Sequence, residues 1–349
     1  GVVIETTKMN KILEYDLENF SVTIEPGVLL QTLAEDALSH GMMYPPDPGE
    51  KFACLGGNVN TNAGGMRAVK YGATRDYVRA MKVVLANGDV VDFGAIVSKT
   101  STGYSLLNLM VGSEGTLGVI TELTLKIIPA PKAVVSLIIP FEDLESAIST
   151  VPKIKMAQLD PQALEFMERE IVLSSERFIG KETFPKQMDG VEVGAYLLVT
   201  FDGKSEEEVM EKVEIACELV LENGAIDVLV ADSPTKIKDA WAARSSFLEA
   251  IESETKLLDE CDVVVPINKI PEFLTFAKSF GAECGLEIKS FGHAGDGNLH
   301  IYQCSNDLEE EEFKKRVDKY FEKLYEEATA CGGLVSGEHG IGMGKIKYL

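Results

Sequence analysis

Two histidines, His293 and His300, stand seven positions apart around a glycine-rich turn. The residues between them include Gly295, Asp296 and Gly297, and an Asp-Gly pair is a strong hairpin signal. The flanking runs, 286–291 and 299–303, have the composition of strands. We therefore expect a hairpin-like turn that carries one imidazole at each flank, with both rings directed at a common point.

A third histidine follows a carboxylate in the segment Gly337-Glu338-His339-Gly340. Three of the four histidines of the chain thus fall in two short glycine-rich segments. His293, His300 and Glu338 form a His-His-carboxylate set, which suits a catalytic divalent metal with open positions for substrate. A chance placement of histidines near a turn is the alternative. The concentration of histidine and carboxylate in glycine loops favours a ligand site, because such loops allow close approach to a ligand.

The composition limits the class of protein. The 349 residues carry a formal net charge of −23, which argues against nucleic acid or an anionic membrane as a partner. No apolar run reaches transmembrane length and no signal segment opens the chain, so we expect a cytoplasmic protein. The six cysteines are scattered without a Cys-x-x-Cys motif, which indicates free thiols rather than an iron–sulfur or zinc-ribbon pattern.

A second group of segments is rich in glycine and asparagine. Residues 55–65 contain four glycines and three asparagines, and they follow the proline-rich run 44–49. Such a loop exposes backbone N–H groups and can lie against a flat or anionic cofactor. It is neither a Rossmann fingerprint nor a P-loop. A plain irregular loop is the alternative. A similar glycine loop, 112–118, leads into an expected strand, 120–127.

The remaining pattern predicts two domains that meet near Pro129 and Pro131. Before this point we expect strands at 1–4 and 20–25, a helix at 28–39 and a hairpin at 78–93. After it, the runs 134–141, 163–167, 195–201 and 226–231 are expected strands, with helices at 143–154 and 205–223. This is the β-α-β-β-α-β order of a ferredoxin-like sheet. Further helices are expected at 239–254 and from about 305 to 329.

These motifs together resemble the FAD-linked 2-hydroxy-acid dehydrogenases, which are vanillyl-alcohol-oxidase-type flavoproteins that include D-lactate dehydrogenases and the D-type subunits of glycolate oxidase. The resemblance spans nearly the whole chain. It rests on the segments 45–48, 56–65, 112–118, 292–300 and 337–342.

The resemblance implies an α+β fold with an FAD-binding domain at 1–131, a ferredoxin-like substrate cap at 132–330 and a catalytic-loop segment at 331–349. It suggests His293, His300 and Glu338 as ligands of zinc, iron or manganese, His339 as the base and Arg244 as the substrate-carboxylate clamp. An ordinary surface salt bridge is the alternative for Arg244. The residues expected to bind FAD are Pro45, Pro46, Asp47, Gly56, Gly57, Asn58, Asn60, Asn62, Gly64, Gly65, Gly112, Ser113, Glu114, Gly115, Thr116, Gly118 and Ile120. No histidine or cysteine lies within 56–65, so we expect the FAD to be non-covalent.

The activity implied is oxidation of a D-2-hydroxy acid, with lactate favoured, and transfer of the electrons to a soluble electron-transferring flavoprotein or iron–sulfur subunit. Two alternatives stay open: a glycolate-type or larger-substrate dehydrogenase, and a non-catalytic flavin-binding subunit. The chain departs from the family pattern in three ways. It begins after the usual pyrophosphate loop, it stops before the usual closing stretch, and it has Tyr302 where some relatives have Asn. We therefore expect a portion of a longer polypeptide.

Overall fold

A computed structural model describes residues 1–349, and its contacts divide the chain into two units. The N-terminal unit comprises residues 1–130 and the short segment 338–342. The central unit comprises residues 131–337 and 343–349. The chain therefore leaves the central unit after Gly337 and re-enters it at Met343. The segment between these residues, 338–342, contains Glu338 and His339.

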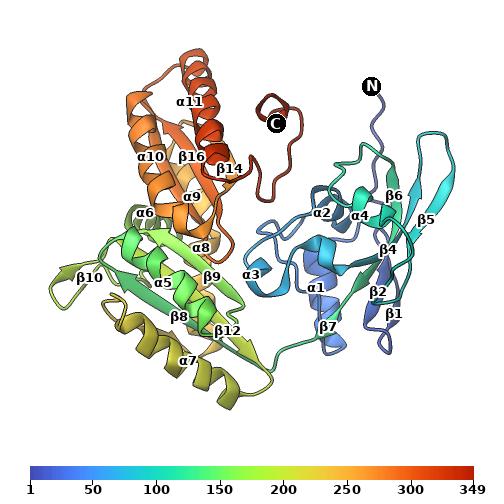
Figure 1. Ribbon diagram of the computed structural model, residues 1–349, viewed down its shortest axis with the longest axis horizontal. Helices are drawn as coiled ribbons and strands as arrows, with labels where there is room; N and C mark the ends of the chain where they lie inside the picture. The colour runs from blue at the N-terminus through green and yellow to red at the C-terminus, as the bar shows by residue number, and fades with distance from the viewer. The chain divides into compact units, whose positions relative to one another are not determined.

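The N-terminal unit is built on a five-stranded antiparallel sheet in the order β1-β2-β6-β4-β5. A pair of short strands, β3 and β7, and four short helices complete it (Figure 1). The strands are β1 Ile12–Asp16, β2 Ser21–Ile24, β3 Met42–Met43, β4 Val78–Val84, β5 Val90–Gly94, β6 Val119–Lys126 and β7 Ile128–Pro129. The helices are α1 Leu30–Ser39, α2 Leu55–Thr61, α3 Ala68–Tyr71 and α4 Leu106–Met110.

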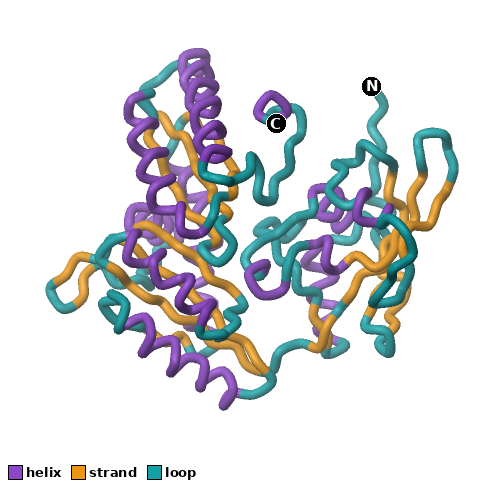
Figure 2. Tube along the Cα trace, in the orientation of Figure 1, coloured by secondary structure: helices purple, strands orange, loops and turns teal.

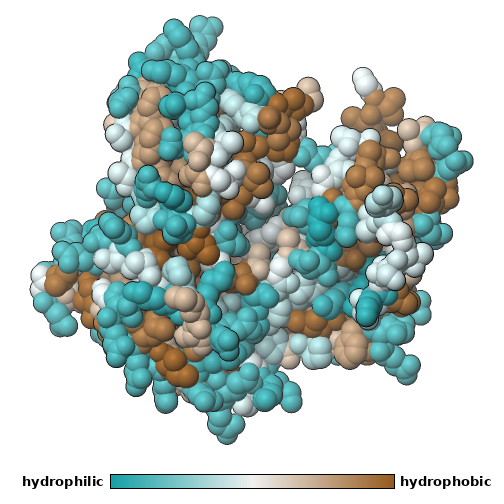
Figure 3. All heavy atoms as spheres, viewed as in Figure 1, coloured by the Kyte–Doolittle hydropathy of each residue, from teal (hydrophilic) through white to brown (hydrophobic).

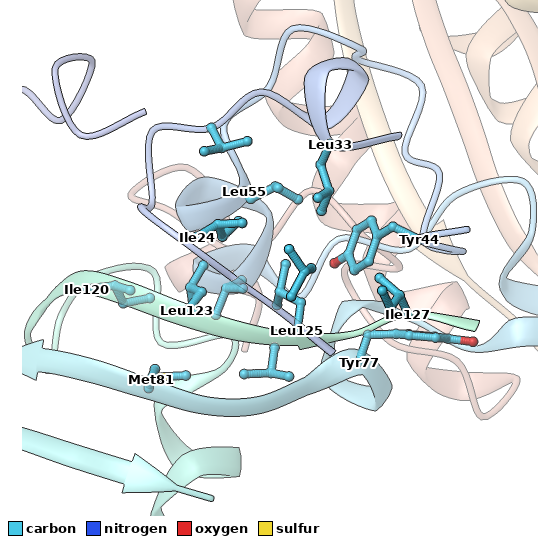
Figure 4. Close-up of a cluster of buried hydrophobic side chains, with 14 of the residues drawn as sticks. Ile24, Leu33, Tyr44, Leu55, Tyr77, Met81, Ile120, Leu123, Leu125 and Ile127 are labelled. Atoms are coloured by element: carbon cyan, nitrogen blue, oxygen red, sulfur yellow. The ribbon is translucent and has the colours of Figure 1, made fainter. Parts of the chain in front are cut away.

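The core of this unit lies between the sheet and the helices α1 and α2. Ile120, Leu123 and Leu125 of β6 are buried and pack with Leu33 of α1 and Leu55 of α2 (Figure 4). Several of the expected flavin segments adjoin this core, because Leu55 opens α2 and Ile120 follows the glycine loop 112–118. The apolar packing therefore fixes the positions of those loops.

Two expectations for the N-terminal unit are wrong. No strand forms at 1–4, where Val2 is 93% exposed, because no neighbouring strand pairs with these residues. The run 55–65 is not one irregular loop, because its first seven residues form α2. Leu55 and Val59 stand four apart, so one helical face buries both in the core despite the low helix propensity of the glycines between them. Asn62 ends the helix in the left-handed conformation, with φ of 53°.

The central unit contains a seven-stranded antiparallel sheet in the order β13-β8-β12-β9-β15-β16-β14. Its first part is the predicted ferredoxin-like motif. In chain order the four motif strands are β8, β9, β12 and β13, and their spatial order is four-one-three-two. The strands are β8 Ala133–Phe141, β9 Ala163–Glu168, β12 Ala195–Gly203, β13 Leu229–Ala231, β14 Leu257–Val264, β15 Glu287–His293 and β16 Asn298–Ser305. A separate small hairpin joins β10 Gln187–Met188 to β11 Val191–Glu192.

Helices cover both faces of this sheet (Figure 2). One face carries α5 Leu144–Met156, α7 Glu206–Leu221, α10 Ile270–Glu283 and α11 Glu310–Ala330. The other carries α6 Arg169–Ile179, α8 Pro234–Ser245 and α9 Phe247–Glu254. Ser205 caps α7 as expected, since its side chain accepts from the backbone N–H of Glu208.

The helices also bring corrections. The single helix expected at 239–254 is two, α8 and α9, which meet at Ser246. The Ser246 Oγ donates to the carbonyl of Ala243 at 3.1 Å, and the turn there lets Ala243 and Phe247 both enter the core. Helices α6 and α10 were not expected, although both are amphipathic and bury apolar residues on one side. None of the helices combines the length and the apolar character needed to span a bilayer.

Several large apolar side chains are exposed on the N-terminal unit. They gather near β5 and the first residues of the chain, where hydrophobic residues show as brown in Figure 3. Val2, Val97, Tyr104 and Leu109 are all more than half exposed.

Candidate active site

The register of the central sheet aligns polar residues from four neighbouring strands. Glu165 of β9 pairs with His293 of β15, and His300 of β16 pairs with Phe291 of β15 and with Asp262 of β14. Paired residues of antiparallel strands project to the same face, and so do residues two apart on one strand. The predicted hairpin is therefore confirmed, and its two histidines lie on the same face as Glu165 and Asp262.

The turn of this hairpin is held closely against the neighbouring chain. It comprises residues 294–297, and Gly297 has a φ of +88°. A Cβ on Gly297 would lie 2.0 Å from the carbonyl oxygen of Val265, and Val265 donates its N–H to the Gly297 carbonyl at 3.0 Å. Glycine is therefore required here for both conformation and space. The close contact fixes the ends of β15 and β16, where the histidines stand.

His293 belongs to a buried triad of charged groups. Its Nδ1 lies 2.7 Å from Oε1 of Glu165, whose side chain is fully buried. Arg244 of α8 donates from Nε and Nη2 to Oε2 of the same carboxylate, at 3.0 and 2.6 Å. The guanidinium also lies over the ring of Phe291, with Cζ 4.7 Å from the centroid. Arg244 is only 7% exposed, so its ion pair with Glu165 is buried and not an ordinary surface salt bridge.

The charge state of Glu165 follows from its two partners. Burial raises the pKa of this carboxyl, but the positive charges and hydrogen bonds of His293 and Arg244 outweigh burial, and the net shift is downward. The group is therefore an ionised carboxylate that only accepts hydrogen bonds. It favours a proton on Nδ1 of His293, and Nε2 is the ring nitrogen that does not face Glu165.

His300 also has its Nδ1 beside a carboxylate, in this case on a different strand. Its Nδ1 lies 3.2 Å from Oε1 of Glu260 on β14. Its ring centroid lies 5.3 Å from that of Phe291 and 5.5 Å from that of His293. Metal-ligating histidines characteristically hold the second ring nitrogen against a carboxylate or carbonyl. Both histidines show this arrangement, so Nε2 is the nitrogen that each would offer to a metal.

Asp262 accepts hydrogen bonds both from the hairpin and from the segment that precedes Glu338. Its Oδ1 accepts from the side-chain amide of Asn298 at 2.6 Å. Its Oδ2 accepts from the hydroxyl of Ser336 at 2.7 Å and from the backbone N–H of Gly337 at 3.1 Å. Gly337 packs so tightly on Asn298 that a Cβ there would lie 2.0 Å from Nδ2. The residue immediately before Glu338 is therefore fixed beside the end of β16.

The segment 338–342 also has defined contacts within the N-terminal unit. Glu114 accepts from the backbone N–H groups of Ile341 and Gly342, at 2.6 and 2.7 Å. A Cβ on Gly64 would lie 3.2 Å from a carboxylate oxygen of Glu338. Residues 338–342 thus lie against two of the expected flavin loops, those containing Gly64 and Glu114.

Three expected flavin segments lie side by side in the N-terminal unit. Asp47 forms a parallel bridge with Gly65. The backbone N–H of Gly112 donates to the carbonyl of Val59 at 2.9 Å, and that of Glu114 donates to the carbonyl of Asn60 at 2.8 Å. Backbone contacts therefore join 45–48, 56–65 and 112–116 into one continuous surface, although they are far apart in the sequence.

Some of the residues expected to bind FAD are packed closely against other parts of the protein. A Cβ on Gly56 would lie 2.7 Å from Cβ of Pro26, and one on Gly65 would lie 2.1 Å from the carbonyl oxygen of Asp47. A Cβ on Gly118 would meet Val83 at 2.5 Å. The side chain of Ile120 is 3% exposed within the core. These residues shape the loops through protein contacts.

The sequence reasoning missed Glu165, Glu260 and Asp262, the carboxylates that support the two histidines and the Gly337 backbone. A signal for Glu165 was available. It is the single charged residue in the apolar run Ala163-Leu164-Glu165-Phe166-Met167, and a carboxylate in a buried strand needs a partner. No local pattern marks Glu260 or Asp262, because their role depends on the pairing of β14 with β16.

Comparison with known proteins gives matches along the chain. Residues 1–94 match an FAD binding domain, and residues 130–349 match the C-terminal domain of the FAD linked oxidases. A D-lactate dehydrogenase of Anaerostipes hadrus is 67% identical over 349 residues, which cover all of this chain and 74% of that protein. Glycolate oxidase subunit GlcD of Bacillus subtilis (strain 168) is 38% identical over 356 residues, which cover all of this chain and 73% of that protein.

The fold is shared with solved flavoenzymes. The structure of 4-ethylphenol oxidase from Gulosibacter chungangensis matches with a TM-score of 0.73 at 17% identity, over 95% of this chain and 71% of that chain. An FAD-binding unit of the vanillyl-alcohol-oxidase type is thus joined to an FAD-linked oxidase C-terminal domain. The chain therefore belongs to the FAD-linked oxidase family, within the group of FAD-linked 2-hydroxy-acid dehydrogenases that contains enzymes named D-lactate dehydrogenase and glycolate oxidase subunit.

Proposed function

We propose that this chain carries the catalytic machinery of an FAD- and divalent-metal-dependent dehydrogenase that oxidises a D-2-hydroxy acid, with D-lactate favoured, to the 2-oxo acid. The observation that carries the proposal is the pair His293 and His300, each with Nδ1 against a carboxylate on a neighbouring strand. The relative named D-lactate dehydrogenase, at 67% identity, supports lactate as the substrate.

The donor set suits zinc, iron or manganese. His293 and His300 would each offer Nε2, and Glu338 would add a carboxylate. Glu338 directly follows Gly337, whose backbone N–H donates to Asp262. When bound, the metal would supply a Lewis acid that lowers the pKa of the substrate hydroxyl.

The joined loops of the N-terminal unit suit FAD. The segments 45–48, 56–65 and 112–116 form one backbone-rich surface with little side-chain bulk at Gly57, Gly64 and Gly115. These segments would hold the flavin through backbone N–H groups and the asparagine side chains. When bound, FAD would supply the acceptor for the C2 hydride.

Two further side chains complete the proposed chemistry. His339 would take the hydroxyl proton as a neutral imidazole. Arg244 would hold the substrate carboxylate. Glu165 occupies the Nε–Nη2 edge of its guanidinium, and the Nη1–Nη2 edge remains for a second, bidentate carboxylate contact. Holding the carboxylate and the hydroxyl together fixes the orientation of C2. The electrons would pass to a separate acceptor, an electron-transferring flavoprotein or an iron–sulfur subunit.

Anaerobic mixing of D-lactate with the purified, flavin-loaded full polypeptide tests the proposal. We expect the yellow absorbance of the flavin to bleach without added NAD, because the substrate reduces the flavin directly. L-lactate serves as the control for stereochemistry. Bleaching by glycolate or a larger 2-hydroxy acid, with no response to D-lactate, would establish the alternative substrate class. The similarity to the glycolate oxidase subunit motivates including glycolate. A flavin that no 2-hydroxy acid bleaches would indicate a non-catalytic subunit.

Tyr302, where the chain departs from the family pattern, belongs to a buried hydrophobic cluster of the central unit. Tyr302 is 4% exposed and stacks on Phe291, with ring centroids 5.5 Å apart. It therefore packs beside the residue that supports both Arg244 and His300.

The bound flavin should be FAD and non-covalent. No histidine or cysteine lies within 56–65, so that loop has no nucleophile to form a flavin bond. Precipitation of the holoprotein with acid is therefore expected to release essentially all the yellow chromophore into the supernatant, where chromatography identifies it as FAD. Colour that stays with the denatured pellet would contradict the prediction.

A further inference from the structure

We infer that Glu165 is a positioning residue that couples the metal site to the substrate-carboxylate clamp, an inference that rests on the function proposed above. Its two carboxylate oxygens serve different partners. Oε1 contacts the proposed metal ligand His293 at 2.7 Å, and Oε2 accepts two bonds from the proposed clamp Arg244 at 3.0 and 2.6 Å. One rigid planar group therefore sets the position of both.

The location of Glu165 is poorly suited to a purely structural role. It stands on β9, an inner strand of the sheet, between Leu164 and Phe166, and its side chain is fully buried. Burying a carboxylate, a guanidinium and an imidazole together is costly, and well-packed apolar residues often stabilise such a site equally well or better. The charged triad does not need to exist for stability. Its two outer members are the groups to which substrate and metal chemistry are assigned.

Glu165 can control the geometry of both partners. The contact between Oε1 and Nδ1 sets the rotation of the His293 ring, which directs Nε2. The Arg244 guanidinium lies against the rings of Phe291 and Phe247, with Cζ 4.7 and 5.5 Å from their centroids. The rings limit movement of the guanidinium out of its plane, and the two bonds to Oε2 set its rotation within the plane. A shift of the carboxylate would thus misplace ligand and clamp together.

Glu165→Gln tests this coupling, because an amide has one acceptor oxygen and one donor NH₂. If the amide oxygen keeps the two bonds from Arg244, its NH₂ faces His293, which must then either lose this contact or carry its proton on Nε2. Either change weakens Nε2 as a metal ligand. We expect the dissociation constant for Zn²⁺ to rise about 10–100-fold. It is measured by titrating Zn²⁺ against a chromophoric chelator in the metal-stripped, flavin-loaded full polypeptide. We also expect the KM for D-lactate to rise by at least about tenfold, with a smaller change in kcat, if the clamp loosens with the ligand.

Glu168→Gln is the matched control. Glu168 lies on the same strand and accepts from the Ser290 hydroxyl at 2.7 Å and from Lys278, but it contacts neither histidine. The Zn²⁺ affinity of the Glu168→Gln variant and its KM for D-lactate should stay within about threefold of the parent values.

A third variant, Arg244→Gln, keeps the contact between His293 and Glu165. It should raise KM while the Zn²⁺ affinity changes less than about threefold.

A Zn²⁺ affinity within about threefold of the parent in Glu165→Gln would overturn the inference if His293→Ala still loses the metal. Retention of the metal in His293→Ala would instead overturn the proposed site, so the two failures are distinguishable.

If Glu165→Gln does not fold, the double variant Glu165→Gln/Arg244→Gln removes the unpaired buried cation. Weak Zn²⁺ binding in the double variant, against parent-like binding in Arg244→Gln alone, supports the inference. Parent-like binding in both overturns it.

Discussion

Replacing His293 or His300 by alanine is expected to remove the divalent metal and nearly all activity while leaving the fold in place. Each imidazole is one of three proposed ligands, and the hairpin that carries them is held by backbone pairing that alanine retains. Loss of Lewis-acid assistance worth several kcal/mol corresponds to a fall in kcat/KM of about 10²–10⁴-fold. Removing one partner of a buried carboxylate costs up to about 3–5 kcal/mol of stability, so a drop in Tm is expected, most of all for the His293 variant, whose partner Glu165 is fully buried.

The measurement is metal content per purified chain, together with steady-state oxidation of D-lactate. His40→Ala is the matched control. His40 ends α1 beside Tyr15, far in sequence from the hairpin, and its ring centroid lies 4.2 Å from the tyrosine ring. This variant should keep its metal and its activity. Stoichiometric metal in both the His293 and His300 variants would remove these residues from the ligand set.

Replacing His339 by glutamine should produce the second large loss. Glutamine retains a polar side chain but cannot accept a proton at neutral pH. General-base assistance contributes about 10²–10⁴-fold, so the rate of flavin reduction by D-lactate should fall by that factor. The metal and flavin should both be retained, because the loop is fixed by the backbone bonds from Ile341 and Gly342 to Glu114, which do not involve the His339 side chain.

Stopped-flow absorbance of the flavin after anaerobic mixing measures this rate directly. Using saturating D-lactate separates a loss of proton transfer from a loss of binding. His40→Gln supplies the corresponding histidine-to-glutamine control. A reduction rate within about threefold of the parent enzyme would show that another group accepts the hydroxyl proton.

Local patterns in the sequence were sufficient where neighbouring residues decide the outcome. The Asp296-Gly297 turn, the Ser205 cap, the helices α5 and α7 and the four strands of the ferredoxin-like motif formed as expected. The family membership was also visible, because its motifs are contiguous runs. Local pattern failed where a distant segment decides the structure. Leu55–Thr61 is helical because Leu55 and Val59 reach the core formed by β2, β4 and β6, and residues 1–4 lack a strand because none lies beside them.

The sequence by itself determined the family, the hairpin that carries His293 and His300, and the ferredoxin-like order of the sheet. The tertiary structure alone decided how the histidines are supported. Glu165 is 128 residues from His293 in the chain, and Arg244 is 79 residues from Glu165. They meet because antiparallel register places Glu165 opposite His293 and because α8 packs on the same face of the sheet. Register depends on all the side chains that two strands bury together, so no short segment of sequence contains it.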